Sequence, residues 1–363
     1  MLATVICSFS GCSENKTEIE NVTKPADTIV EVTEKTENEF VEEIPEPEPD
    51  PEPVITFINP LTGLESEKDL TSKRPISIMV NNIHAALPQI GISEADIIYE
   101  ILEEGGITRL LCIYNDYSEI PEIGSIRSAR DYYIDIADAH DAIFIHAGGS
   151  KYAYSDLAAR RTNNLDGLYL NQFYRNAERK KTMATEHTLM ISGNGIDEAI
   201  ALKGYRTESD APCPLAFSWN YEKGSSAATH IQFPFVIGRT AKPYVTAFFD
   251  YDAEKGEYLK GQFDSPHIDG DDNSQLSFKN VITLTCPMNH IQGDAYGRIQ
   301  VHLTGTGYGT YSVDGTHREI VWKKSSRSSS YTLYESDGET PLLTAPGKSY
   351  VALVSTGTNI TIN

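Results

Sequence analysis

The sequence predicts an α/β domain over residues 54–210, followed by an all-β domain, a sandwich or barrel-like fold, over residues 211–363. Two observations carry this prediction. In the first region, strongly apolar runs alternate with runs whose apolar residues have helical spacing. In the second region helical spacing disappears, and short β-rich runs follow one another with turn residues between them. At 363 residues the chain is long enough for two domains that each bury a core.

The chain begins with MLATVICSFSGC, a run of apolar or small residues that ends in a cysteine after Ser10 and Gly11. This run resembles a bacterial lipobox, in which small side chains precede a cysteine whose thiol carries diacylglycerol. Phe9 departs from the leucine that is usual there. We expect residues 1–12 to be a lipoprotein signal peptide that ends in the lipidated Cys12. The alternative is a frayed apolar terminus.

Residues 13–53 form an acidic, proline-rich tail that ends in EIPEPEPDPEP. Fourteen Asp and Glu against three Lys give this tail a net charge of −11, half of the −22 of the whole chain. Alternating prolines and like charges keep a chain extended and leave too little apolar surface to fold. We therefore expect a disordered spacer between a membrane anchor and the folded domains. This places the protein on the outer face of the cytoplasmic membrane.

The charge and the cysteines exclude several classes of protein. Neither the tail nor the remainder has the basic field that binding to phosphate backbones needs, so nucleic acid is excluded as a partner. After the N-terminal run, no apolar stretch approaches the ~18 residues of a membrane span. Cys112, Cys213 and Cys286 are too few and too far apart for a disulfide framework or a zinc site, and Cys112 is expected to be a small buried residue.

The predicted elements of the first domain follow in order along the chain. RPISIMVNN, residues 74–82, is apolar enough to be a strand buried on both faces. Two β-rich runs then flank Gly105 and Gly106, which predicts a hairpin. Helical spacing of apolar residues begins near Ala129, a strand with a glycine turn follows in residues 141–150, and a helix, a strand and a helix complete the domain.

The second domain is predicted from a succession of short β-rich runs separated by turn residues. These runs are FPFVI, PYVTAFFDYD, EYLKGQF, NVITLTC, GRIQVHLTGTG, GTYSVDG, REIVWKK, SYTLYESDG and SYVALVST. No repeat of fixed period is visible among them.

Several motifs occur in a characteristic order: NPLTGL, RPISIMVNN, ADIIYEILEEGGITRLL, IGSIRSARDYYIDIA and HAGGS, then KNVITL and DGTHREIVWKK in the β-rich region. Together they closely resemble the YerB-like lipoproteins of Gram-positive bacteria, over nearly all of the chain after the tail. The resemblance implies a two-domain, lipid-anchored envelope protein. It implies no reaction, because that family has no established biochemical activity.

A fainter similarity connects the chain with the LytR-CpsA-Psr proteins, which handle cell-wall polymers linked to polyprenyl pyrophosphate. In those proteins an Arg-Asp element and a later Gly-Gly turn border the phosphate site. Arg130-Asp131 and Gly148-Gly149 match these two elements loosely. This similarity is one of pattern only.

Two arginines, Arg127 and Arg130, lie where a loop is expected to become a helix. Ser128 and Asp131 fit a capping box, which predicts a helix start at Ala129 and puts Arg130 in the first turn. A cation there opposes the helix dipole by about 0.3 to 1 kcal/mol unless negative charge lies nearby. That charge is either internal or external.

The internal alternative supplies the negative charge from the chain itself: Asp131 or the glutamates of the preceding hairpin, Glu100, Glu103 and Glu104, form ion pairs with the arginines. The external alternative supplies it from a phosphate or carboxylate ligand bound at the helix start. Arg109 in the hairpin joins either arrangement.

Residues beside a predicted glycine turn are weaker candidates for the same site. His146 ends an apolar strand, where α/β sheets place ligands, although a structural role is the commoner one. Gly148, Gly149 and Ser150 form either an anion-binding turn or, for Ser150, a helix N-cap. The predicted ligand-binding set is Arg109, Arg127, Ser128, Arg130, Asp131, His146, Gly148, Gly149 and Ser150.

We predict neither a metal nor a cofactor. The chain lacks the Gly-x-Ser-x-Gly, Walker and His-Glu-x-x-His motifs. The acidic stretch SPHIDGDDN, residues 265–273, is interpreted as a solvated hairpin loop in preference to a cation site.

The first functional hypothesis is a non-catalytic envelope lipoprotein that binds an anionic ligand, a cell-wall component or an envelope protein near Arg127 and Arg130. The alternative is an enzyme acting on phosphorylated or lipid-linked cell-wall precursors. In that alternative Arg109, Arg127 and Arg130 hold the phosphate, and Asp131 serves a metal or a proton.

Overall fold

The computed structural model describes residues 56–238 and 242–363. Residues Val54–Asn363 form one compact unit, separate from Met1–Pro53. The predicted signal peptide, Cys12 and the acidic spacer therefore lie outside the described residues. Within the described residues, none of the helices combines the length and the apolar character that crossing a membrane requires.

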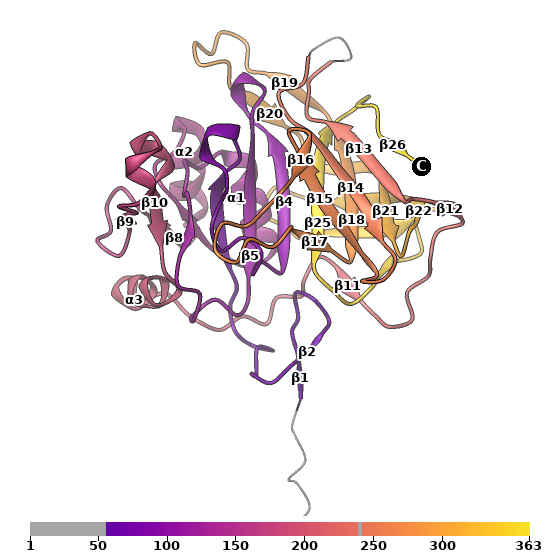
Figure 1. Ribbon diagram of the computed structural model, residues 1–363, viewed down its shortest axis with the longest axis horizontal. Coiled ribbons are helices and arrows are strands. Elements are labelled where there is room, and N and C mark those ends of the chain that lie inside the picture. The colour runs from indigo at the N-terminus through magenta and orange to yellow at the C-terminus, as the bar shows by residue number, and fades with distance from the viewer. Residues whose placement is uncertain (1–55, 239–241) are drawn as a thin grey trace, which may run out of the picture. The chain divides into compact units, whose positions relative to one another are not determined.

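An eleven-stranded sheet dominates the structure and runs through both halves of the chain (Figure 1). Its centre contains β3 (Ile76–Asn81), β4 (Ile97–Leu102) and β5 (Thr108–Tyr114), in which every residue is buried. For β3 this burial confirms the predicted strand buried on both faces, and β4 and β5 form the predicted antiparallel hairpin. Gly105 and Gly106 between β4 and β5 have φ values of +75° and +77°, which glycine adopts without strain.

The C-terminal half enters this sheet through β25 (Ser349–Ser355). β25 lies parallel to β4 on one side and parallel to β18 (Asn280–Cys286) on the other. Beyond β18 the sheet continues through β21 (Gly305–Val313) to β22 (Thr316–Lys324), which also pairs with β12 (Ser226–Ala227) and β23 (Tyr331–Glu335). Strands from the two halves of the sequence are thus hydrogen-bonded neighbours.

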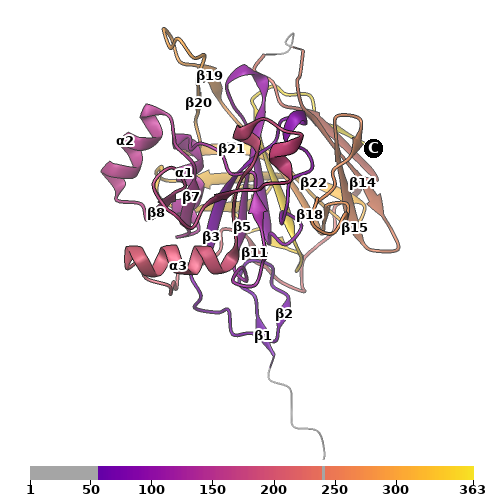
Figure 2. The same cartoon turned by 60° about the vertical axis from the view of Figure 1, so that its left-hand side comes forward.

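The other end of the sheet is formed by β7 (Ile143–His146) and β8 (Asn164–Asp166). Figure 2 shows α2 (Lys151–Arg160) and α3 (Gly193–Lys203) beside this end. Their N-caps are Ser150 and Ser192, whose hydroxyls accept from backbone N–H groups three residues later. The remaining α-helix of the described residues is α1 (Asp131–Ala139).

A six-stranded sheet packs against the main sheet. It contains β13 (His230–Pro234), β14 (Thr246–Asp252), β15 (Glu257–Gln262), β16 (Ser265–Pro266), β17 (Ser277–Phe278) and β26 (Thr361–Ile362). The rings of Phe249 and Phe278 lie 4.8 and 5.4 Å from the ring of Tyr350 on β25. Apolar side chains of the two sheets therefore share one core, as in a sandwich.

Short strands and 3₁₀ turns complete the described residues. The short sheets pair β1 (Phe57–Ile58) with β2 (Glu65–Ser66), β11 (Ala216–Phe217) with β24 (Leu343–Thr344), and β19 (Met288–His290) with β20 (Ile299–Val301); β10 (Leu189–Ile191) lies between β6 (Ile123–Gly124) and β9 (Tyr174–Arg175). The 3₁₀ turns are η1 (His84–Ala86), η2 (Glu104–Gly106), η3 (Arg179–Lys181) and η4 (Thr185–His187).

The fold is mostly β. From residue 211 onward the described residues form strands without helices, in agreement with the predicted all-β region. The three α-helices lie before that point, as predicted. A separate α/β domain over residues 54–210 is not evident, because β4 of that region pairs directly with β25.

A buried polar core joins the two halves. Glu100 on β4 lies 3.4 Å from the ammonium group of Lys260 on β15, and both side chains are completely buried. The Tyr350 hydroxyl also donates to Glu100, and Asn82 donates to Glu100 over 2.8 Å. The core also contains Gln89, Thr108, Gln262 and His267, all linked by hydrogen bonds.

Burial changes the pKa values of two groups in this core, Lys260 and His267. It lowers the pKa of Lys260, an effect that the Glu100 carboxylate opposes, and it lowers the pKa of His267, as does the adjacent Lys260. Three contacts of this core cross between the two halves: Glu100 with Lys260, Asn82 with Gln262, and Gln89 with His267. Losing one partner leaves the other buried and unpaired, which is costly in such a place.

Removing the Glu100 carboxylate tests this dependence. We expect Glu100→Gln to lower the free energy of unfolding by about 3 kcal/mol, because Lys260 is left buried without a counter-charge. Adding Lys260→Met should restore part of that loss, since no buried charge then remains. Urea unfolding followed by circular dichroism measures both effects.

The control is the exposed pair of Lys68 and Asp116, whose charged groups lie 2.9 Å apart. Asp116→Asn should cost less than about 1 kcal/mol. If the double substitution in the core costs as much as the two single substitutions added together, Glu100 and Lys260 are not energetically coupled.

Candidate functional site

The two arginines of the candidate site precede a helix that begins later than predicted. α1 starts at Asp131, and Arg130 is its N-cap residue with an extended backbone and no side-chain cap. Ala129 donates to the carbonyl of Gly148 over 2.8 Å and accepts from Ser150 over 3.1 Å. This pairing with the glycine turn keeps the chain extended, so the predicted capping box of Ser128 and Asp131 is wrong.

Arg109 and Arg130 are paired inside the protein. An Arg109 Nη1 atom lies 3.0 Å from Glu103, and Arg130 Nη2 lies 3.6 Å from the same carboxylate. Arg130 also donates to both oxygens of Glu104, from Nε over 3.0 Å and from Nη2. Two cations thus face two carboxylates, and Glu103 is completely buried. This geometry favours the internal alternative for these two arginines.

The pKa directions agree with this pairing. Burial raises the pKa of Glu103, although Arg109 and Arg130 oppose it. Burial alone would lower the pKa of Arg130, but the carboxylates of Glu103 and Glu104 outweigh it and raise that pKa. Burial acts to raise the pKa of Glu104, yet its hydrogen bonds to Arg130 bring that pKa below its usual value. Glu100, also considered as a partner, pairs with Lys260 instead.

Arg127 differs from the other two arginines. Its side chain keeps 23% of its surface exposed, and the Glu186 carboxylate lies 3.9 Å away. Among the residues that the structure describes, its Nε has no hydrogen-bond partner, and its guanidinium donates from Nη1 to the backbone carbonyl of Glu186 over 3.2 Å. Burial and the neighbouring Arg109 lower the pKa of Arg127. Its charge is therefore only partly compensated.

The glycine turn is held by an acidic residue that the sequence did not single out. Gly148 has a φ of +73°, and its N–H donates to Asp166 Oδ1 over 2.8 Å. This carboxylate occupies the place where an anion would accept from the turn. Ser150 caps α2, as the structural alternative predicted. His146 is buried, with its ring nitrogens 2.8 Å from the Gly148 carbonyl and 3.2 Å from Asn164 Oδ1.

Asp131 belongs to a different cluster from the arginines of the hairpin. Its carboxylate lies 3.2 Å from Arg327, which follows β22, and burial raises its pKa. Together with Asp135, His302 and Arg327 it lines a pocket of about 210 Å³. Arg327 also pairs with Asp135 over 3.1 Å. The carboxylate that the enzymatic alternative assigns to a metal or a proton is thus held in an ion-pair network.

No group of three or more His, Cys, Asp and Glu side chains is placed to hold a metal ion among the residues that the structure describes. In the acidic loop 265–273, Asp269 is buried and accepts from the backbone N–H groups of Gly91 and Ser93 over 3.0 and 2.7 Å. His267 belongs to the polar core. This loop therefore supports residues 91–93, and the interpretation of it as a solvated loop is wrong for the buried His267 and Asp269.

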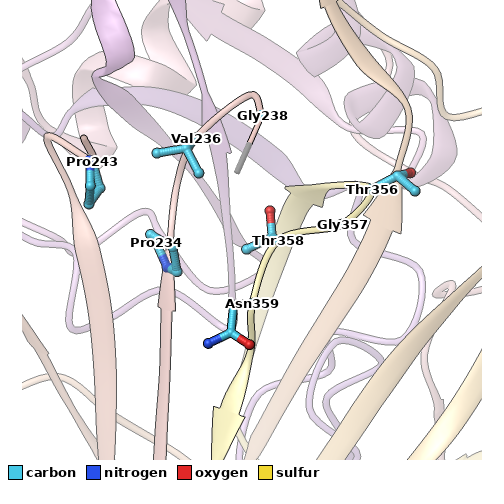
Figure 3. A pocket seen from close by; sticks show the side chains of 8 residues that line it. All are labelled: Pro234, Val236, Gly238, Pro243, Thr356, Gly357, Thr358 and Asn359. Atoms are coloured by element: carbon cyan, nitrogen blue, oxygen red, sulfur yellow. The ribbon is translucent and has the colours of Figure 1, made fainter. Parts of the chain in front are cut away.

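A pocket of about 580 Å³ lies in the C-terminal half between β13 and the segment before β26 (Figure 3). Figure 3 shows that prolines, glycines, a valine, threonines and an asparagine line it. Among the residues that the structure describes, its lining is uncharged, and none of the residues of the predicted anion site belongs to it.

Three exposed apolar side chains adjoin the glycine turn and were not predicted as a group. Tyr154 donates to Asp166 Oδ2 over 2.8 Å, and a methyl group of Leu168 lies 3.0 Å from the position that a Cβ on Gly148 would take. Tyr169, next to Leu168, is 77% exposed. In the sequence these residues fall in an irregular stretch and on a helix, so their spacing gave no signal.

Comparison with known proteins identifies the family. Residues 61–206 match the N-terminal domain and residues 239–351 the C-terminal domain of a family described as "Protein of unknown function (DUF3048)". The chain belongs to this family. It is 29% identical to "Putative lipoprotein YerB" of Bacillus subtilis over 267 residues. The aligned region covers 73% of this chain and 77% of the relative.

The crystal structure of the YerB protein of Bacillus subtilis has the same fold as this DUF3048 protein. The two share a TM-score of 0.73 and 25% sequence identity, and the match covers 84% of this chain and 99% of the other. The resemblance to YerB-like proteins that the motifs indicate is thereby confirmed. The pattern similarity to the LytR-CpsA-Psr proteins stays a prediction.

Arginine substitutions separate the structural from the exposed members of the cluster. We expect Arg130→Ala to lower the free energy of unfolding by about 3 kcal/mol, because it leaves the buried Glu103 with one cation fewer. Arg127→Ala should cost less than about 1 kcal/mol. Urea unfolding of both variants measures the difference, and equal small losses would contradict the pairing described here.

The Arg130→Ala loss should also depend on pH. Burial already raises the pKa of Glu103, and removing Arg130 raises it further. The folded variant then binds a proton more readily than the unfolded chain, so its stability increases as the pH falls through that pKa. The deficit relative to the unsubstituted protein should be smaller at about pH 5 than at about pH 8.

Proposed function

We propose that this DUF3048 protein is a non-catalytic binding protein of the cell envelope, anchored by lipidated Cys12 to the outer face of the cytoplasmic membrane. In this proposal Arg127 contacts an anionic group of a cell-wall component or an envelope protein. The lipoprotein designation of the Bacillus subtilis relative supports the anchor. The acidic spacer of residues 13–53 separates that anchor from the folded body.

The observation that carries the binding site is the incomplete pairing of Arg127. Arg109 and Arg130 use their charges on Glu103 and Glu104, whereas Arg127 keeps a partly exposed guanidinium whose acidic partner, Glu186, lies 3.9 Å away. A guanidinium fork is suited to carboxylate or phosphate groups. The exposed Tyr154 and Tyr169 beside the glycine turn supply apolar contact area, which tyrosine and arginine commonly provide together in interfaces.

The geometry gives the enzymatic alternative less support. That alternative needs three arginines free for a phosphate and Asp131 free for a metal or a proton. Two of the arginines are engaged by buried or half-buried glutamates, and Asp131 is engaged by Arg327.

Native mass spectrometry tests the proposed site. The full chain is purified in detergent from the organism's own envelope fraction, and bound anionic masses are recorded. We expect Arg127→Ala to reduce the occupancy about tenfold, the effect of one lost charge-assisted hydrogen bond. Glu186→Ala should increase it, because Arg127 loses its competing carboxylate.

The control is Arg161→Ala, which removes an exposed arginine at the end of α2. Its occupancy should equal that of the unsubstituted protein. An equal loss in both arginine variants, or a protein that retains no anionic mass in any form, would contradict a site at Arg127.

A further inference from the structure

The segment of residues 167–186, between β8 and β10, exposes an unusual combination of side chains. Leu168 and Tyr169 are 56% and 77% exposed, and Tyr174 on β9 is also exposed. The cations of the segment's surface are Arg175, Lys180 and Lys181. Figure 1 shows β9 and the turn before it at the left-hand margin of the folded unit.

Buried residues of this segment fix it to the rest of the folded unit. Arg179 is buried and donates to the carbonyls of Ala86, Pro88 and His187 over 2.8, 2.7 and 3.1 Å. At the other end, the N–H of Leu168 donates to Asp166 over 3.0 Å, and Phe173 is buried. The segment therefore presents its side chains on a preformed surface and loses little conformational freedom when it binds.

We propose that this segment is a membrane-contact surface for anionic phospholipid, with Leu168, Tyr169 and Tyr174 entering the headgroup region and Lys180 and Lys181 contacting lipid phosphates. Tyrosine is favoured at membrane–water interfaces, and apolar side chains with adjacent lysines are the composition of interfacial anchors. Leu168 and Tyr169 lie in the turn after β8 and are exposed, which suits contact with a lipid surface.

Charge does not oppose this contact despite the acidic character of the protein. Outside the tail the chain carries a net charge of −11, since −22 includes −11 from residues 13–53. Charges farther away than a Debye length, about 8 to 10 Å in physiological salt, are largely screened. Within the segment, Glu178 lies 2.6 Å from Lys181, but both side chains are exposed, and such a surface pair is weak enough for Lys181 to exchange it for a lipid phosphate. Lys180 forms no ion pair among the described residues.

This inference rests on the proposed membrane location but not on the site at Arg127. The lipid anchor holds the body close to the bilayer, so even a weak contact is populated because the effective concentration is high. The contact would orient the body on the membrane surface. The two proposals share Tyr169, but the vesicles and the lysine variants belong to this test alone, and Arg127 belongs to the other, so either can fail alone.

Vesicle sedimentation tests the proposal with residues 54–363 and vesicles of phosphatidylcholine, with or without phosphatidylglycerol. We expect binding to the anionic vesicles that weakens at high salt. Lys180→Ala with Lys181→Ala should weaken it up to about 25-fold, since a lysine near an anionic surface contributes about a fivefold factor. Leu168→Ser with Tyr169→Ser should weaken it at both salt concentrations.

The chain offers matched controls for both pairs. Leu202 and Tyr308 are 68% and 73% exposed on other elements, and Lys203 and Lys255 are exposed as well. Leu202→Ser with Tyr308→Ser, and Lys203→Ala with Lys255→Ala, should leave vesicle binding unchanged. Equal losses in the control variants overturn the proposal. The proposal is also overturned if the unsubstituted protein does not bind anionic vesicles. It is overturned as well if the lysine pair variant and the Leu168/Tyr169 variant bind them as strongly as the unsubstituted protein.

Discussion

The insertion of β25 between β4 and β18 is the constraint on which the rest of the structure depends. A strand from the last fifteen residues of the chain pairs with a strand that begins at Ile97. Without it, β4 would be a sheet edge composed of fully buried residues, which soluble proteins avoid. The two family domains therefore share one sheet, and the Glu100–Lys260 pair adds a polar bond between them in the same place.

The motifs that identify the family lie mainly in this shared interior. Asn82 and Glu100 belong to the polar core, and Glu103, Arg109 and Arg130 form the neighbouring ion-pair cluster. These residues look like a binding site in the sequence because arginine and glutamate are usually exposed. In the structure they hold β4, β5 and the segment before α1 together. Tyr169, by contrast, is exposed and lies beside the glycine turn.

Local elements could be predicted from the sequence, and long-range partners could not. The apolar run of β3, the glycine pair of the hairpin and the cap at Ser150 are local signals, and each appears as expected. The capping box at Ser128 failed because Ala129 pairs with the glycine turn, about twenty residues later in the chain. Asp166 and Arg327 were missed for the same reason, since only folding brings each to its partner. The parallel pairing of β4 with β25 spans most of the chain and has no local signature.

Separate expression of residues 54–210 and 211–363 tests the shared sheet most directly. If β25 completes the sheet of the first part, neither fragment alone should show cooperative urea unfolding by circular dichroism. Mixing the two should restore a single transition and the spectrum of the intact unit. A fragment of residues 54–210 that unfolds cooperatively by itself, and whose transition does not change when the second fragment is added, would contradict this.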